Sequence, residues 1–248
     1  GCVEPQKAGK TEGWHDAAFF NMCRPLELVF ANGMDKGEIV GIPTGDVTQM
    51  KSFEEFFDAY KKQMEYCISL LVNADNAIDV AHAERCPLPF LSCMIDDCLK
   101  EGRSVQEGGA VYNFTGPQGF GIANMADGLF AIRKLVYEEK KVSMEEFKEA
   151  LAWNYDKGLD AQSAGDMTEM IMKAMQKAGK EADASTAAGL LKTFIGMKPG
   201  EQKTQRFKEI HDMIDEVPKF GNDIPEIDYF AREVAYTYSK PLQNYSNP

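Results

Sequence analysis

The first five residues, Gly1-Cys2-Val3-Glu4-Pro5, carry two side chains that can do chemistry. Pro5 disfavours the helical conformation at Glu4, so the segment should be extended, and alternate side chains then leave from the same face. Cys2 and Glu4 would lie about 7 Å apart, at about 3.3 Å of rise per residue, which leaves room for one small substrate. Gly1 can adopt the φ values of a tight turn that would present the thiol to a cavity. A thiol facing a carboxylate is a catalytic arrangement, and the alternative is an exposed terminus with one free thiol and one solvated carboxylate.

Two further stretches combine aromatic, acidic, histidine and glycine residues: residues 13–21 (GWHDAAFFN) and residues 108–118 (GGAVYNFTGPQ). Together with the Cys-Val-Glu-Pro-Gln start, they resemble the glycyl radical enzymes. The resemblance is to the branch of glycerol and propanediol dehydratases, choline and sulfonate lyases and arylacetate decarboxylases, with pyruvate formate-lyase more distant. It covers most of the chain.

The resemblance implies an α/β fold in which two five-stranded parallel half-sheets form a ten-stranded barrel, with the cysteine loop inside and helices outside. This chain would be a helix-rich internal fragment, because the Arg-Val-x-Gly-Tyr loop that bears the radical glycine in the family is not in the sequence. Residues 1–157 would form a central barrel segment with the cysteine loop and the glycine-rich wall. Residues 158–216 would be an exposed helical insert, and residues 217–248 would return to the barrel.

The resemblance also implies a mechanism, in which Cys2 becomes a thiyl radical and Glu4 acts as general base. Asp16 would bind substrate hydroxyls, and the substrate would be lined by His15, Phe19, Tyr112 and Phe114. No cofactor would be bound, since a separate iron–sulfur activating enzyme that uses S-adenosylmethionine installs the glycyl radical outside this fragment. We therefore expect a cytoplasmic lyase of anaerobic metabolism that acts as a homodimer on a small molecule.

The substrate class stays open at this stage. Asp16 favours a vicinal diol such as glycerol or propanediol, whereas the aromatic side chains and the 158–216 insert would suit an arylacetate decarboxylase. Sulfonate lyases share the Cys-x-Glu pair. An alternative of another class is a non-catalytic helical protein whose 158–216 helices bind a partner. A nucleotide loop at 116–121 is disfavoured, because its glycine order is not that of dinucleotide-binding proteins.

The composition excludes several classes of protein. The net charge is −12 and the pI is near 4.8, with scattered basic residues, which argues against a nucleic-acid partner. No apolar run reaches the roughly 18 residues that indicate a membrane span. The cysteines form no Cys-x-x-Cys pair, which is typical of reduced thiols in a cytosolic protein: Cys2, Cys23, Cys67, Cys86, Cys93 and Cys98.

The elements that must position these residues are mostly predicted to be helices. Residues 14–30 favour a buried helix that ends at Asn32-Gly33, and Ser52 with Glu55 forms a capping box before a long core helix. Residues 108–121 are expected to be an irregular wall that brings backbone close to a substrate. Further helices are expected at 90–99, 122–139, 144–155 and 227–238, with two or three more between 158 and 216.

Asp75, Asp79 and His82 follow at helical spacing, which places three possible metal ligands on one helix face. A metal site there would need a further ligand that the sequence does not clearly supply. The alternative is a polar face that makes internal hydrogen bonds. The resemblance favours this alternative, because the family needs no metal at its active site.

Overall fold

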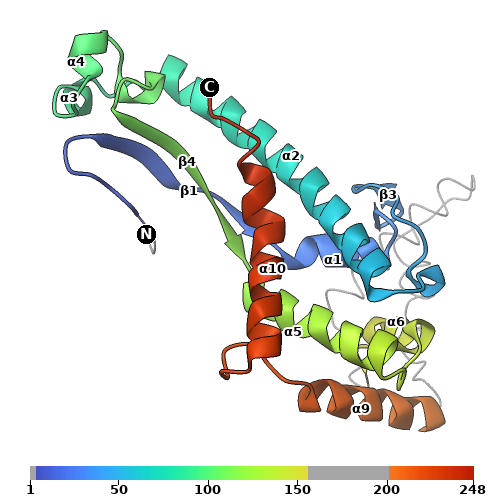
Figure 1. Ribbon diagram of the computed structural model, residues 1–248. Helices are drawn as coiled ribbons and strands as arrows, with labels where there is room; N and C mark the ends of the chain where they lie inside the picture. The colour runs from blue at the N-terminus through green and yellow to red at the C-terminus, as the bar shows by residue number, and fades with distance from the viewer. Residues whose placement is uncertain (1–3, 156–200) are drawn as a thin grey trace, which may run out of the picture. The chain divides into compact units, whose positions relative to one another are not determined.

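The computed structural model describes residues 4–155 and 201–248, which form a mixed α/β, helix-rich structure (Figure 1). Cys2 and most of the 158–216 segment therefore lie outside the described residues. The elements, in chain order, are β1 (Thr11–Asn21), α1 (Cys23–Phe30), β2 (Met34–Asp35), β3 (Glu38–Ile39), the 3₁₀ turn η1 (Val47–Gln49), α2 (Phe53–Arg85), α3 (Pro89–Ser92), α4 (Cys98–Glu101), the 3₁₀ turn η2 (Val105–Glu107), β4 (Tyr112–Phe120), α5 (Ile122–Ile132), the π-helical η3 (Arg133–Glu138), α6 (Met144–Ala152), α9 (Glu201–Glu216) and α10 (Pro225–Leu242).

The chain divides into two compact units, and each takes part of α2 and part of α10. The first unit contains residues 1–23, 64–122 and 233–248. The second contains residues 24–63 and 123–232. The candidate site residues within the described part of the chain all belong to the first unit.

The first unit is built on two parallel strands, β1 and β4, which lie side by side in Figure 1. Their register is regular from Thr11 opposite Tyr112 to Trp14 opposite Thr115, and it resumes at Ala18 opposite Pro117. Three residues of β1 therefore face one residue of β4 between these pairs, which is a β-bulge.

Helices α2 and α10 pack on the same face of this sheet. The Trp14 indole donates to Asp79 of α2, and the Phe20 ring lies 5.1 Å from the Tyr238 ring of α10. The Tyr238 hydroxyl donates to the Pro117 carbonyl oxygen at 3.0 Å. A side chain at Gly119 would lie 2.7 Å from the Tyr238 ring, so glycine is what allows this close contact.

The second unit has an aromatic core. Rings from α1, α2, η3, α6 and α10 lie 5.6 to 6.4 Å from their neighbours: Phe30, Phe53, Phe56, Phe57, Tyr137, Phe147 and Phe230. Gln63 of the same unit is fully buried, and its side-chain amide pairs with the backbone N–H and C=O of Ile42. This pairing compensates for the loss of water around a buried amide.

The predicted helix over 14–30 is wrong in its first part. Residues up to Asn21 belong to β1, and α1 begins only at Cys23. The sequence hides the strand because both of its faces meet apolar rings: Phe20 contacts Tyr238, while Phe19 contacts Phe120. The apolar residues therefore lack the period of two that marks a half-buried strand.

The irregular wall predicted over 108–121 and the helix predicted over 90–99 also differ from the structure. Residues 112–120 form strand β4 despite glycine and proline, which are normally depleted in strands. Residues 89–101 form the two one-turn helices α3 and α4 instead of one helix. They are separated because Asp97 adopts a left-handed φ of 75°, which cannot continue a helix.

Other predictions are confirmed. Ser143 and Glu146 form the expected capping box of α6, and Ser52 Oγ accepts from the Glu55 backbone N–H at 3.3 Å. After α1, Gly33 has a φ of 78° and donates to the Leu28 carbonyl oxygen, as a helix stop should. Helix α5 and η3 together cover the predicted helix over 122–139.

Among the described residues, the strands form one parallel pair and one antiparallel pair, so the barrel implied by the resemblance is not seen in them. No helix in the described ranges is long and apolar enough to cross a membrane.

Candidate active site

The predicted substrate-binding residues that the resemblance supplied lie on one face of the β1–β4 sheet, opposite the face that α2 and α10 cover. Alternation along β4 places Tyr112 and Phe114 on this face. On β1, His15 joins them, since its ring lies 4.8 Å from that of Phe114. Phe19 lies 5.2 Å from the ring of Phe120, at the other end of the same face.

The β-bulge presents the polar residues of this face. It consists of His15, Asp16 and Ala17 on β1, all opposite Gly116 on β4. A Cβ atom at Gly116 would lie 3.0 Å from the His15 Cα atom and 3.1 Å from its carbonyl oxygen. Any larger residue would therefore push against the backbone of the bulge. Bulges next to active sites commonly redirect a side chain in this way.

Gln118 holds the bulge from the β4 side. Its side-chain amide donates to the Asp16 carboxylate and, at 3.0 Å, to the His15 carbonyl oxygen. One amide thus fixes both the backbone and the acidic side chain of the bulge. The Asp16 carboxylate is exposed on the open face, where its remaining lone pairs can accept from the hydroxyl groups of a small molecule.

The segment that carries the catalytic candidates folds back toward the bulge. Gln6 Nε2 lies 3.3 Å from His15 Nε2, and the Lys7 backbone N–H donates to Thr11 Oγ1 at 2.8 Å. Glu4 is exposed and lies two residues before Gln6 in the sequence. The position of Cys2 relative to Glu4 lies outside the described residues.

The open face is lined by half-exposed aromatic rings. The exposed fraction is 66% for Phe19, 49% for Tyr112 and 48% for Phe120. Lys7 Nζ lies 5.9 Å from the Tyr112 ring centroid. This combination of apolar rings with one fixed carboxylate and one imidazole is suited to a small molecule that has both hydroxyl and hydrocarbon parts.

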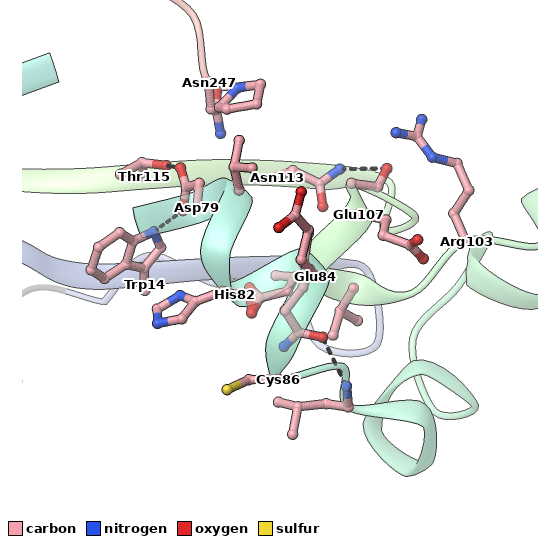
Figure 2. A pocket seen from close by; sticks show the side chains of 18 of the residues that line it. Trp14, Asp79, His82, Glu84, Cys86, Arg103, Glu107, Asn113, Thr115 and Asn247 are labelled. Carbon is pink, nitrogen blue, oxygen red and sulfur yellow. Dashed lines mark hydrogen bonds between the residues drawn. The ribbon is translucent and has the colours of Figure 1, made fainter. Parts of the chain in front are cut away.

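A separate pocket of about 580 Å³ lies on the covered side of the sheet (Figure 2). Burial raises the pKa of Glu12, which lines this pocket, and the charge of Asp79 adds to the increase. Of the predicted site residues that the structure describes, Phe114 alone lines it, so the pocket and the candidate active site share this one residue. Its other polar lining residues include Trp14, His82, Glu84, Arg103, Glu107, Asn113 and Thr115.

The Asp75, Asp79 and His82 face of α2 does not form a metal site in the described residues, where no group of three metal-ligating side chains is close enough. Asp79 instead accepts hydrogen bonds from Trp14 and Thr115. Asp75 is 4% exposed, and its Oδ2 atom has no hydrogen-bond partner. Burial raises the pKa of Asp75, and the nearby charge of Asp79 raises it further.

Three residues of this site were missed from the sequence: Gln6, Gly116 and Gln118. Gln6 and Gln118 were inside the quoted motifs, but nothing in a motif shows which side chain holds the bulge. Gly116 has an ordinary φ, so its importance comes from the space that it leaves for His15. Only the strand register reveals that role.

A family model described as pyruvate formate lyase-like matches residues 1–248. Among curated proteins, (2S)-3-sulfopropanediol dehydratase of Klebsiella oxytoca is 40% identical over 157 residues, which are 62% of this chain and 19% of that protein. Several solved structures cover the whole chain, and two of them are closely related to dehydratases by their descriptions. One, on 1,2-propanediol dehydration in Roseburia inulinivorans, has 59% identity and a TM-score of 0.95, and 30% of it is covered. The other, the glycerol-bound B12-independent glycerol dehydratase of Clostridium butyricum, has 42% identity and a TM-score of 0.77, and 25% of it is covered.

The chain therefore spans less than a third of the length of these relatives. The family match and both structures nevertheless extend over the chain from end to end.

Proposed function

The chain belongs to the pyruvate formate lyase-like family of glycyl radical enzymes, and from that premise we propose that it is part of a dehydratase that removes water from a small 1,2-diol. The similarity to proteins named for propanediol and glycerol supports this substrate class. The observation that carries the proposal is the bulge, which holds Asp16 and His15 on one open face beside the N-terminal segment.

Strands β1 and β4 would be two adjacent strands of the ten-stranded barrel of the complete enzyme, since they are parallel and already covered by helices on one face. The open face would then point to the barrel interior. Its half-exposed rings would be enclosed by the remaining strands and by the cysteine loop. This arrangement would exclude water from the reaction.

Substrate binding falls to the bulge. The Asp16 carboxylate accepts hydrogen bonds from the diol hydroxyls, and Gln118 keeps it in place. His15 offers a ring nitrogen next to the same hydroxyls, held against Phe114. Charge-assisted hydrogen bonds of this kind are roughly twice as strong as neutral ones, so Asp16 should dominate the recognition of hydroxyl groups.

The chemistry falls to Cys2 and Glu4. A glycyl radical of the complete enzyme, installed by an S-adenosylmethionine-dependent activating enzyme, would supply the oxidising equivalent by accepting the hydrogen atom of the Cys2 thiol. The Cys2 sulfur then takes a hydrogen atom from the carbon that bears one hydroxyl, and that hydroxyl becomes more acidic. Glu4 accepts its proton as general base.

Loss of water completes the reaction. The neighbouring C–O bond breaks, and the proton accepted by Glu4 balances the one that the departing hydroxyl needs to leave as water. Cys2 returns its hydrogen atom to the carbon that lost the hydroxyl. The products are one aldehyde and one water. Glu4 is again a carboxylate, and Cys2 is again a thiyl radical, which would return to the thiol by taking back a hydrogen atom from the radical-bearing glycine.

The test is to activate the full-length protein anaerobically with its activating enzyme and to supply propane-1,2-diol, glycerol, an arylacetate and a hydroxyalkane sulfonate. We expect an aldehyde from a diol, detected as its hydrazone. Cys2→Ala and Glu4→Gln should each reduce turnover to background. Asp16→Asn should raise KM about 10- to 100-fold, the equivalent of one charge-assisted hydrogen bond.

Each other outcome is informative. Turnover of the arylacetate or the sulfonate without turnover of any diol would replace the dehydratase proposal by a decarboxylase or a C–S lyase. Full activity in Cys2→Ala would contradict the thiyl role. A radical-bearing protein that converts none of the four substrates would favour the non-catalytic interaction protein.

A further inference from the structure

Asp79 is a residue of helix α2 whose carboxylate contacts both strands of the sheet. The Trp14 indole N–H donates to Oδ1 at 2.6 Å, and the Thr115 hydroxyl donates to Oδ2 at 2.5 Å. Figure 2 shows both hydrogen bonds converging on the one carboxylate. Each oxygen is thus used by a different strand.

The two donors are not an arbitrary pair of strand residues. Trp14 and Thr115 are paired neighbours on the adjacent strands β1 and β4, and they form the last regular pair before the bulge. The residue after Trp14 is His15, and the residue after Thr115 is Gly116, the single residue opposite the bulge. Asp79 therefore ties the two strands to a helix at the point where their register changes.

The orientation of the indole is fixed from a second side. The His82 ring, one helical turn after Asp79 on α2, lies 5.3 Å from the Trp14 ring in an edge-on arrangement. Trp14 can therefore move along the strand direction only if it loses the hydrogen bond to Asp79 and the contact with His82. A hydrogen bond to a charged partner resists such movement more strongly than a neutral one.

A bulge needs this kind of support because strand register is otherwise free to slip. If β1 shifted by one residue, every side chain would move to the opposite face, and Asp16 would leave the open face. Gln118 holds the bulge on the open face, and Asp79 holds the pair before it on the covered face. The bulge is thus fixed from both sides of the sheet.

We propose that Asp79 is a positioning residue for the reaction: by bridging Trp14 and Thr115, it fixes the register that presents Asp16 and His15 to the substrate. This proposal rests on the proposed function for the identity of the substrate, but the register itself does not depend on it. Asp79 touches no reacting atom, because it lies on the opposite face of the sheet. It also replaces the metal-ligand role considered for this residue, since both carboxylate oxygens already accept hydrogen bonds.

The variants follow from the geometry. Asp79→Leu removes both acceptors while keeping a similar size. Asp79→Asn is the conservative variant, because its Oδ1 can still accept from Trp14 and its amide can donate to the Thr115 hydroxyl. Glu84→Gln is the matched control, since Glu84 lies on the same helix and lines the same pocket.

The first measurement is kinetic, with the activated full-length enzyme and a diol. We expect Asp79→Leu to lower kcat/KM about 10- to 100-fold, mainly through KM, at an unchanged radical content by electron paramagnetic resonance. Asp79→Asn should stay within about threefold of the parent, and Glu84→Gln should match it. In an Asp16→Asn background, Asp79→Leu should add less than its full loss, because the carboxylate that makes the strongest of the positioned contacts is already gone.

The second measurement needs no turnover. Hydrogen exchange of peptides that span residues 12–20 should become faster in Asp79→Leu and stay at the parental rate in Asp79→Asn and Glu84→Gln. Should Asp79→Leu fail to accumulate, Thr115→Val and Trp14→Phe each remove one of the two donors and should show a smaller increase in exchange.

The outcomes separate the two proposals. Unchanged exchange in Asp79→Leu, or kinetic losses that simply add to those of Asp16→Asn, would overturn the positioning role. Absence of diol turnover in the parent enzyme, together with faster exchange in Asp79→Leu, would reject the proposed function and leave the control of register by Asp79 in place.

Discussion

The two faces of the β1–β4 sheet are made by the same two strands, yet different forces hold them. On the covered face, Trp14 and Phe20 pack against side chains of α2 and α10, and the contacts extend into the body of the unit. On the open face, the hydrogen bonds run within the sheet itself, from Gln118 to the bulge, and the rings are half exposed. The covered face thus contributes mainly to stability, and the open face carries the residues proposed to bind the substrate. Substitutions on the covered face should therefore change the free energy of unfolding more than substitutions on the open face.

Phe20→Ala should cause the largest loss of stability, because it removes the ring of β1 that packs against the Tyr238 ring on the covered face. We expect a loss of about 3 kcal/mol in the free energy of unfolding, since truncating a packed phenylalanine removes apolar contacts and leaves a cavity. Urea unfolding of the full-length protein measures it. A loss below about 0.5 kcal/mol would contradict the division between the two faces.

Gly116→Ala tests the bulge that joins the faces. A methyl group there would meet backbone atoms of His15 at 3.0 to 3.3 Å, and backbone cannot move aside as a flexible side chain can. We expect a destabilisation of about 2 kcal/mol together with a higher KM for the diol. Gly128→Ala in helix α5 is the control, because nothing lies within 4 Å of the added carbon, and it should be neutral or stabilising by up to about 1 kcal/mol.

Asp75→Asn tests the buried polar group of the covered side. Burial raises the pKa of Asp75 above its ordinary value of 3.8, so the folded state favours the neutral carboxyl. The resulting stability is fully present below pH 3.8 and is lost as the pH rises through the raised pKa. Asparagine cannot ionise, so the variant should be more stable than the parent by about 1 kcal/mol at pH 7.

The pH dependence of this stability difference tests directly whether the ionisation of Asp75 causes it. Thermal unfolding at several pH values should show the advantage of Asp75→Asn shrinking as the pH is lowered toward the ordinary carboxyl range. A difference between variant and parent that is constant with pH would show that the ionisation of Asp75 plays no part.

Phe19→Ala should have the smallest effect on stability, within about 0.5 kcal/mol, because this ring is 66% exposed on the open face. Under the proposed function it should still weaken substrate binding, since the ring lines the face that carries Asp16. Comparison with Phe20→Ala is direct, because the two residues are neighbours in sequence. Equal losses of stability in the two variants would mean that the open face is itself part of the core.

The sequence was sufficient for features whose physical cause is local. The capping box at Ser143, the hydrogen bond from the Glu55 N–H to Ser52 Oγ and the helix stop at Gly33 depend on residues three to five positions apart, and the structure has them. The Glu55 carboxylate, however, accepts from the backbone N–H of Lys51 and not from that of Ser52, so the box at Ser52 is only half formed. The long helix α2 followed from the spacing of its apolar residues. Resemblance also selected His15, Asp16 and Phe114, which the structure gathers on one face.

What the sequence could not supply was anything set by pairing between distant segments. Strand β1 was mistaken for a helix because aromatic rings lie on both of its faces at Phe19 and Phe20, and its partner β4 is too rich in glycine and proline to be recognised. The bulge exists only in the register between them. Asp79 was singled out for its charge and spacing, but its partners Trp14 and Thr115 lie 65 and 36 residues away.

The parallel pairing of β1 with β4 has a consequence for how the protein is made. Parallel neighbours cannot be joined by a tight turn, and here the segment 22–111, about 90 residues, separates them. At the usual pace of synthesis, about 5 to 20 residues per second, β1 would wait about 5 to 20 seconds for its partner. During that time the unpaired edge of β1 could form hydrogen bonds with strands other than β4. The residues proposed for recognition can thus come together only after strand β4 has been made, long after β1 itself.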